Sequence, residues 1–539
     1  MEGVRRRQHS FAILFQRIPK RQRLREFTPS QDRPGYAATM MHAPPDSAET
    51  RADRDSNGLL AQVRSAVIWR SGTQIIAQIV MWASTFLVIR ILEPEDYGLF
   101  AMTGVMLAFL NLMNGWGLAS GLVQKPEVSA RDIRQTFGML IAVNLALAAA
   151  QLLLAPLAAA YFREPRVATL LQVQSLLYLT TPIIAIQYAM LARAMEYRIQ
   201  GFVNIAASLV AALTALAGAL AGWGVWTLVF APIALFATRA IGFTVAARGL
   251  VWPSFDFRGG RALAGFGGAM ALTQLFQFLL GQSDVFIAGR AFDAHTLGIY
   301  TTALFLAQIF LNKIVPPLNE VAFSAFSRIQ HDAGLRAEAF VRATRAVMLA
   351  ALPFFLGLAA TAEPLVHVVL GPKWSETAPI VRLIALAMPF MTLQALLVPA
   401  TDATGNPRIA AGNSAIGALL LAGCYLVGVQ WGVRGLAAAW LVAMPLWCAI
   451  SLARSLPVLG VPTSKLVAAL VPVTLAALAM AALVTLVDRF VSAMPDAPRL
   501  ALLVLAGASG YLLLLLLIAR PALAELVAIA RNRPATVAT

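Results

Sequence analysis

The chain has 539 residues, of which 59% are hydrophobic and only 13% charged, and its mean hydropathy is +0.73. A soluble protein of this length could not bury so much apolar surface, so the composition excludes an ordinary soluble enzyme and predicts a membrane protein. A net charge of +16 would suggest nucleic-acid binding in a soluble chain. In a membrane protein this charge belongs to loops and tails on one side of the membrane.

The first 60 residues differ from the rest, because they are rich in Arg and Pro and contain no span-length apolar stretch. Their composition predicts a disordered, basic cytoplasmic tail. A second interpretation is that translation starts at Met40 or Met41, so that the upstream residues are an extension of the reading frame. Both interpretations stay open.

Fourteen apolar stretches follow, each long enough to cross a membrane as a helix. The first six are 66–89, 97–122, 136–162, 167–192, 199–221 and 224–246. The next six are 264–290, 297–325, 344–370, 379–401, 408–430 and 432–453, and the last two are 465–487 and 499–519. We therefore expect an all-α polytopic membrane protein with an N-lobe (61–250), a C-lobe (260–455), two further helices (464–520) and a short tail (521–539).

A repeat relates the two predicted lobes. The segment from Arg90 to Phe100 aligns without a gap on the segment from Arg290 to Tyr300, and Trp223-Gly-Val-Trp226 resembles Trp431-Gly-Val-Arg434. Because six spans separate the repeats, both lobes start on the same side of the membrane. Two like-oriented halves are typical of transporters that rock one half against the other. Inner loops hold more Lys and Arg than outer loops, which predicts that both termini are cytoplasmic.

Polar side chains inside the spans are the candidate site residues. An ionisable group there costs roughly 2.5–3.5 kcal/mol on insertion scales, so it tends to face a cavity or a partner. We expect a hydrated cavity between the lobes, lined by Arg70, Gln74, Gln78, Asn111, Gln274, Gln277, Asp284, Asn312, Lys313 and Glu320. The alternative is polar contact between packed helices, with Lys313 pairing with Glu320.

Asp284 is the most unusual of these residues, because it takes the place of Ser84 in the first half. A lone carboxylate in lipid would be paired or protonated. We expect it to face the cavity and either to pair with Arg70 or Lys313, or to bind a proton or Na⁺ during transport. No His/Cys cluster, HExxH motif or Walker-type loop is present in the sequence, so no catalytic residue, metal or cofactor is expected.

Four short motifs resemble a known family when they are taken in order. They are Gly121-Leu-Val-Gln-Lys125, Asp284 to Arg290 followed by Leu297-Gly-Ile-Tyr300, Phe323-Ser-Ala-Phe-Ser-Arg328, and Leu370-Gly-Pro-Lys-Trp374. Over about residues 60–490 the chain is similar to the polysaccharide flippases of the MOP exporter superfamily, of the Wzx type and WzxC-like branch.

This resemblance implies a non-enzymatic flippase in the bacterial inner membrane. Such a protein moves undecaprenyl-diphosphate-linked oligosaccharide to the outer leaflet for exopolysaccharide or lipopolysaccharide synthesis. Arg70 and Lys313 would then attract the diphosphate, and the amides would bind sugar hydroxyls. The implied partners are the lipid-linked oligosaccharide, membrane lipids, polysaccharide polymerase and export machinery, and a coupling H⁺ or Na⁺, with no nucleic acid.

Two other functions compete with this one. A cation-coupled antiporter of small molecules, from the multidrug branch of the same superfamily, would share the fold but usually has twelve spans. A membrane glycan polymerase or ligase would normally carry a large extramembrane loop, and the loops here are short.

Overall fold

A computed structural model describes residues 77–111, 128–247, 251–255 and 267–518, together with positions 72, 119, 122, 123 and 125. Within 267–274 only the backbone is described. These parts of the chain are helical apart from short connections and residues 251–255, and they contain no strand. Ten segments of these parts are long and apolar enough to cross a membrane, and two of them, Arg166–Arg193 and Pro407–Leu459, each comprise two α-helices. The predicted all-α polytopic membrane fold is confirmed.

Within the described residues, each of the fourteen predicted spans overlaps one helix or two consecutive shorter ones. The first half contains a helix over Ala77–Ile91, then α3 (Pro94–Asn111), α5 (Ala130–Phe162), α6 (Arg166–Gln174), α7 (Leu177–Arg193), α8 (Tyr197–Leu220) and α9 (Val225–Ala246). The second half contains α11 (Gly267–Ala291), α12 (Ala294–Arg328), α13 (Ala333–Ala360), α14 (Ala362–Val369), the short 3₁₀ helix η1 (Pro372–Trp374), α15 (Thr377–Ala403), α16 (Pro407–Gly428), η2 (Val429–Trp431) and α17 (Gly432–Leu459). The last two helices are α18 (Thr463–Val491) and α19 (Asp496–Ile518).

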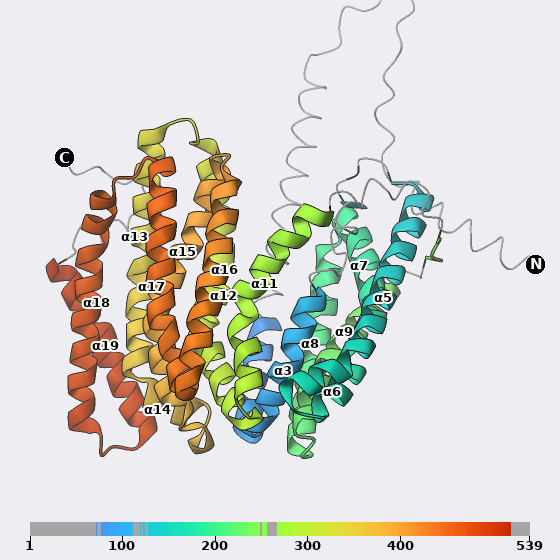
Figure 1. Cartoon of the computed structure of the whole chain (residues 1–539), viewed down its shortest axis with the longest axis horizontal. Coiled ribbons are helices and arrows are strands. Elements are labelled where there is room, and N and C mark those ends of the chain that lie inside the picture. Colours follow the sequence, from blue (N-terminus) through green and yellow to red (C-terminus); the bar gives the residue numbers. More distant parts are fainter. Residues whose placement is uncertain are drawn as a thin grey trace, which may run out of the picture. The chain divides into compact units, whose positions relative to one another are not determined.

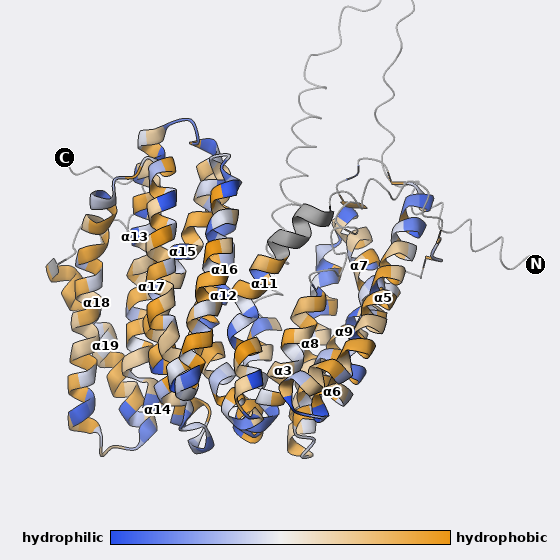
Figure 2. Ribbon diagram, in the orientation of Figure 1, coloured by the Kyte–Doolittle hydropathy of each residue, from blue (hydrophilic) through white to orange (hydrophobic). Residues whose placement is uncertain are grey.

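Local chemistry fixes several helix ends. Ser129 and Asp132 form a reciprocal capping box at the start of α5, while Asp293 and Asp332 accept hydrogen bonds from the first turns of α12 and α13. Gly460, in the left-handed conformation, ends α17. Between these polar ends the helices are mostly apolar, and Figure 2 shows apolar colours along the lengths of the helices with hydrophilic residues gathered towards their ends.

The described helices form two groups (Figure 1). In the N-terminal bundle, defined here as the helix 77–91 and α3 to α9, α8 packs along α9, and α7 contacts both α5 and α9. In the C-terminal bundle, α11 to α17, the central helix is α15, which contacts α12, α13, α16 and α17. The pair α18 and α19 packs against α13.

The bundles contact each other mainly where α3 crosses α12. A Cβ added to Gly98 would lie 1.7 Å from the carbonyl oxygen of Ala294, and one added to Gly298 would lie 1.7 Å from that of Pro94. Glycine is therefore needed at both positions for the helices to approach this closely. The two contacts are reciprocal and are related by the 200-residue offset of the sequence repeat.

The same offset holds for the backbone just before the crossing. Residues 92–93 and 292–293 both interrupt the helix, and the amides of Leu92 and Phe292 donate to the carbonyls four residues earlier at 2.9 and 2.8 Å. The repeated segments thus form the same helix–break–helix turn. Superposition of the whole halves stays a prediction.

Candidate functional site

The end of the molecule at the α3–α12 crossing, called here the closed end, is held by contacts from both bundles. From the C-terminal bundle, Lys373 donates to the carbonyl of Ile91 at 2.7 Å and forms an ion pair with Glu93 at 3.1 Å. The fully buried Trp374 donates its indole N–H to the carbonyl of Ile89 at 2.9 Å. The helix η1 therefore covers the end of the first described helix of the opposite bundle.

A corresponding contact joins the end of α5, in the N-terminal bundle, to the end of α11, in the C-terminal bundle. Arg290 donates to the carbonyl of Tyr161 at 2.7 Å, and its guanidinium lies 5.6 Å from the centre of the Tyr161 ring. That ring stacks on Phe286 with a centroid distance of 4.5 Å. Each bundle thus reaches over the first helix of the other, so separating them at this end breaks both sets of contacts.

An ion-pair network connects the loop between α5 and α6 to α3 at the same end. Arg166 contacts Glu95 at 2.6 Å and Glu164 at 2.9 Å. The hydrogen bond from Arg166 holds the pKa of the Glu164 carboxyl below its ordinary value. Arg166 is about half exposed, with 53% of its side chain accessible, so the network adds little stability on its own.

Away from the closed end, predicted site residues lie on exposed faces of α3, α11 and α12. The ammonium of Lys313 donates to the side-chain oxygen of Gln78 at 2.7 Å and lies 5.9 Å from the Trp82 ring. This contact joins α12 to the first described helix. Four more predicted residues are exposed: Asn111, Gln277, Asn312 and Glu320. Arg70 and Gln74 lie outside the described residues, as does the side chain of Gln274.

The alternative pairing of Lys313 with Glu320 is not found among the described ion pairs, because Lys313 turns to Gln78 instead. Trp82 was missed by the sequence analysis. Its signal is its spacing, since it lies one helical turn after Gln78 on the same face.

Asp284 does not face the open region, contrary to expectation. Its side chain is 3% exposed, and one carboxylate oxygen accepts a hydrogen bond from the Tyr300 hydroxyl at 2.8 Å. Gln277 and Asp284 share a face of α11, as the sequence predicted, but Gln277 is exposed whereas Tyr300 of α12 covers Asp284. The expected pair with Lys313 is also absent, since Lys313 contacts Gln78.

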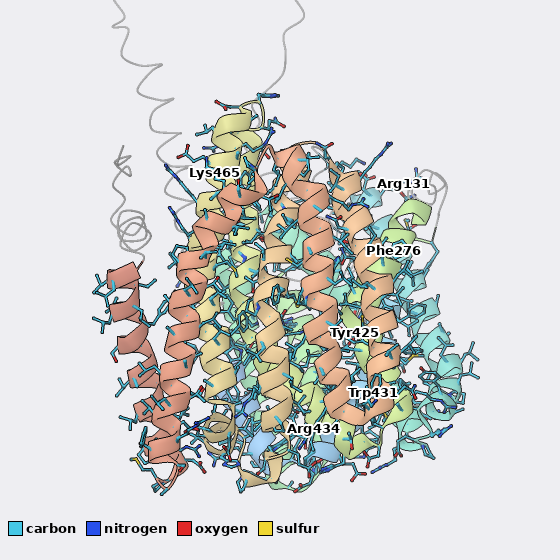
Figure 3. The ribbon with its side chains drawn as sticks, turned by 60° about the vertical axis from the view of Figure 1, so that its left-hand side comes forward. Arg131, Phe276, Tyr425, Trp431, Arg434 and Lys465 are labelled. Carbon is cyan, nitrogen blue, oxygen red and sulfur yellow. The ribbon has the colours of Figure 1, made fainter. Side chains whose placement is uncertain are left out.

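Two further aromatic residues surround this carboxylate and were missed by the sequence analysis. Trp440 donates to the Tyr300 hydroxyl at 2.9 Å, and the Tyr425 ring lies 5.5 Å from the Trp440 ring. Tyr425 lies in the last turn of α16, above Trp431 in Figure 3. A comparison of the two repeats could have indicated this pair, because Tyr300 takes the place of Phe100 and Asp284 takes the place of Ser84. Both polar changes therefore occur in the same half.

Two helical bundles joined at one end, with charged and amide side chains exposed away from the joint, are an architecture typical of polytopic transporters. A family profile described as polysaccharide biosynthesis protein matches residues 87–379. The chain belongs to this family.

Relatives with assigned roles support the same class. The succinoglycan biosynthesis transport protein ExoT of Rhizobium meliloti is 26% identical over 352 residues, 65% of this chain and 71% of that protein. TuaB of Bacillus subtilis, a teichuronic acid biosynthesis protein, is 23% identical and covers 71% of this chain and 80% of its own length. WzxC of Escherichia coli, a lipopolysaccharide biosynthesis protein, is 22% identical over 55% of this chain and 61% of its own length.

Among solved structures, the inward-closed form of the lipid II flippase MurJ matches with a TM-score of 0.67 at 14% identity. The match covers 84% of this chain and 99% of that one, and it supports the fold alone. The predicted resemblance to polysaccharide biosynthesis proteins of the Wzx type is confirmed by the family profile and by these relatives.

Proposed function

We propose that the chain is a flippase that moves an undecaprenyl-diphosphate-linked oligosaccharide from the inner to the outer leaflet of the bacterial inner membrane. The family and the assigned roles of the relatives favour a lipid-linked glycan as cargo. The positive-inside charge distribution favours cytoplasmic termini. Polysaccharide polymerase and export machinery would receive the product, and membrane lipids would surround both bundles.

One observation carries this proposal: the bundles are joined at one end while polar side chains are exposed beyond the joint. The reciprocal contacts of Gly98 and Gly298 lie at the joint. Beyond it, Lys313 and the amides occupy exposed positions on helices that belong to both halves. A polar glycan could use such a surface while its lipid tail stays in the bilayer, and rocking about the joint would give alternating access.

The cations are assigned to the diphosphate. The ammonium of Lys313 lies in an exposed position next to the Gln78 amide and the Trp82 indole, where an anion can reach it. Arg70 is predicted one turn inside the cytoplasmic end of the first span, where it would meet the diphosphate first. A region of low dielectric strengthens both attractions.

We assign coupling to Asp284. It is buried without a cation among its described contacts, and Tyr300 supplies its side-chain hydrogen bond. A buried carboxylate in this setting is stabilised by taking up H⁺ or Na⁺. Exchange of that cation would change the charge inside the C-terminal bundle and bias its packing.

The deciding experiment uses purified protein in liposomes that carry a fluorescent polyprenyl-diphosphate oligosaccharide in one leaflet. We expect the protein to expose the label to an impermeant quencher on the opposite side, and Arg70→Ala to stop this movement. Movement of a cationic dye with no movement of the glycan lipid would instead favour the antiporter. Lengthening of the glycan without transfer would favour a polymerase or ligase.

A further inference from the structure

A groove of about 850 Å³ runs along the surface of the C-terminal bundle between α16 and α17. Its walls are apolar or small, and they include Gly423, Val427, Ala438 and Val442. Arg434 is the charged residue of this lining, and Trp431 lies beside it. No residue of α3, α11 or α12 lines the groove, so it is separate from the candidate transport site.

Small residues explain why the groove exists. A Cβ added to Gly428 would lie 2.7 Å from the carbonyl oxygen of Gly435, and one added to Gly435 would lie 2.4 Å from that of Gly428. The two helices therefore touch closely at this end. Beyond the contact, a Cβ added to Gly423 would meet nothing within 4 Å, so the surface there is hollow.

The N-terminal bundle provides an internal comparison through the second sequence repeat. Gly224 and Gly432, in the two Trp-Gly-Val turns, both have positive φ, of 55° and 73°. In the N-terminal bundle the position of Arg434 is Trp226, which stacks on Phe230 at 5.7 Å. Because Phe230 corresponds to Ala438 in this alignment, the C-terminal bundle lacks the aromatic pair and carries a cation and a hollow in its place.

The mouth of the groove has the chemistry of a membrane interface. Arg434 is exposed and has no ion pair among the described residues, and Trp431 is 71% exposed. Figure 3 shows both at the end of the molecule opposite to Arg131 and Lys465, residues that the predicted topology places on the inner side. Exposed Trp residues favour the headgroup level, and a cation there attracts anionic headgroups.

We propose that this groove binds an anionic glycerophospholipid of the outer leaflet, with its acyl chains along Gly423 and Ala438 and its phosphate at Arg434. The volume lies within the range of roughly 300–1,000 Å³ that is typical of small-molecule sites. An arginine fork matches phosphate oxygens better than a solvated ammonium would. The proposal does not depend on the identity of the transported cargo.

The test uses the full-length protein in phosphatidylcholine nanodiscs that contain a phosphatidylglycerol with a photoactivatable acyl chain. We expect lipid adducts on peptides from 419–442. Unlabelled phosphatidylglycerol should compete about fivefold better than phosphatidylethanolamine, the factor expected for one cation near an anionic lipid. Gly423→Leu should reduce these adducts to background because its side chain fills the hollow.

Matched variants separate the proposed site from ordinary lipid contact. Arg434→Gln, a change at an exposed position that leaves the groove open, should abolish the preference for phosphatidylglycerol. Arg489→Gln, another exposed arginine in a predicted outer loop, and Ala479→Leu, on the exposed surface of α18, should change nothing. Equal competition by phosphatidylethanolamine, equal labelling of α18 and α19, or competition only by a polyprenyl diphosphate would each overturn the proposal.

Discussion

At the scale of single residues, Lys313 connects the transport proposal to a measurable contact. Its bond to Gln78 joins helices of the two halves, and it is exposed. We expect Lys313→Gln to reduce the initial rate of glycan-lipid movement in liposomes about tenfold or more, because hydrogen bonds to charged groups contribute about 1.5–3 kcal/mol. Ser324→Ala, on the same helix and also exposed, is the control. An unchanged rate in Lys313→Gln would remove this residue from the diphosphate contact.

The buried carboxylate gives a second prediction at this scale. Asp284→Asn keeps the shape of the side chain but cannot bind a cation through its charge. We expect transport by this variant to lose its response to imposed pH and Na⁺ gradients, measured separately in liposomes. Tyr300→Phe removes the hydrogen-bond donor and leaves the carboxylate, so it should keep the response. A variant at 284 with a wild-type rate and wild-type gradient dependence would contradict the coupling assignment.

Sequence reasoning placed these residues on the correct helix but did not indicate their surroundings. Helix periodicity places Gln277 and Asp284 on one face, and the structure agrees. Periodicity does not indicate which residues of neighbouring helices cover that face. In the structure Tyr300 covers the face at Asp284, whereas Gln277 stays exposed. For the same reason Glu320 on the same helix was one of the alternatives for Lys313, whereas the contact comes from Gln78, in a distant segment of the chain.

At the scale of elements, the crossing of α3 and α12 is set by two glycines. We expect Gly98→Ala to force the closed end apart, since its Cβ would meet a carbonyl oxygen at 1.7 Å. Overpacking costs about 1–3 kcal/mol, which is enough to shift a two-state equilibrium about tenfold.

The measurement is labelling of Ala294→Cys, a buried position at the crossing, by an impermeant thiol reagent in a background without Cys424 and Cys448. Labelling should rise in Gly98→Ala. The control is Gly104→Ala on the same helix, where an added Cβ meets nothing within 4 Å. Equal labelling in the two variants would show that the crossing does not hold this end closed.

Most elements were predictable because apolar length is a strong signal in a membrane chain. Breaks within the spans and the exact helix ends were harder to predict. The predicted span 167–192 is divided into α6 and α7, and α13 begins at Ala333, well before its predicted start. In the second case Asp332 caps a helix that extends beyond the apolar stretch, and hydropathy does not record such an extension.

At the scale of the whole molecule, the proposed rocking motion makes opposite predictions for the two ends. Spin labels at Ala130→Cys and Arg408→Cys report the predicted cytoplasmic end, and labels at Ala221→Cys and Glu376→Cys report the closed end. Both pairs connect the two bundles at exposed positions. We expect electron-paramagnetic distances of the first pair to shorten when those of the second lengthen. Changes of the same sign in both pairs would exclude rocking about a fixed site.

The sequence contained the repeat, the number of spans and the family resemblance, but it could not indicate which end would be closed. That choice depends on contacts such as Trp374 with Ile89 and Arg290 with Tyr161, which join segments far apart in the chain. Neither contact leaves a recognisable pattern in the local sequence. A transporter also needs two arrangements of similar free energy, so one sequence must be compatible with both.

The reciprocal crossing has a further consequence for the history of the chain. Gly98 meets the start of α12 as Gly298 meets the start of α3, which is the self-complementary contact of a two-fold dimer. Two separate copies of a half-length polypeptide could have formed the same joint, with one glycine in each copy. After fusion, each half keeps the other from diverging here, because a larger side chain in either half strikes the backbone of its counterpart.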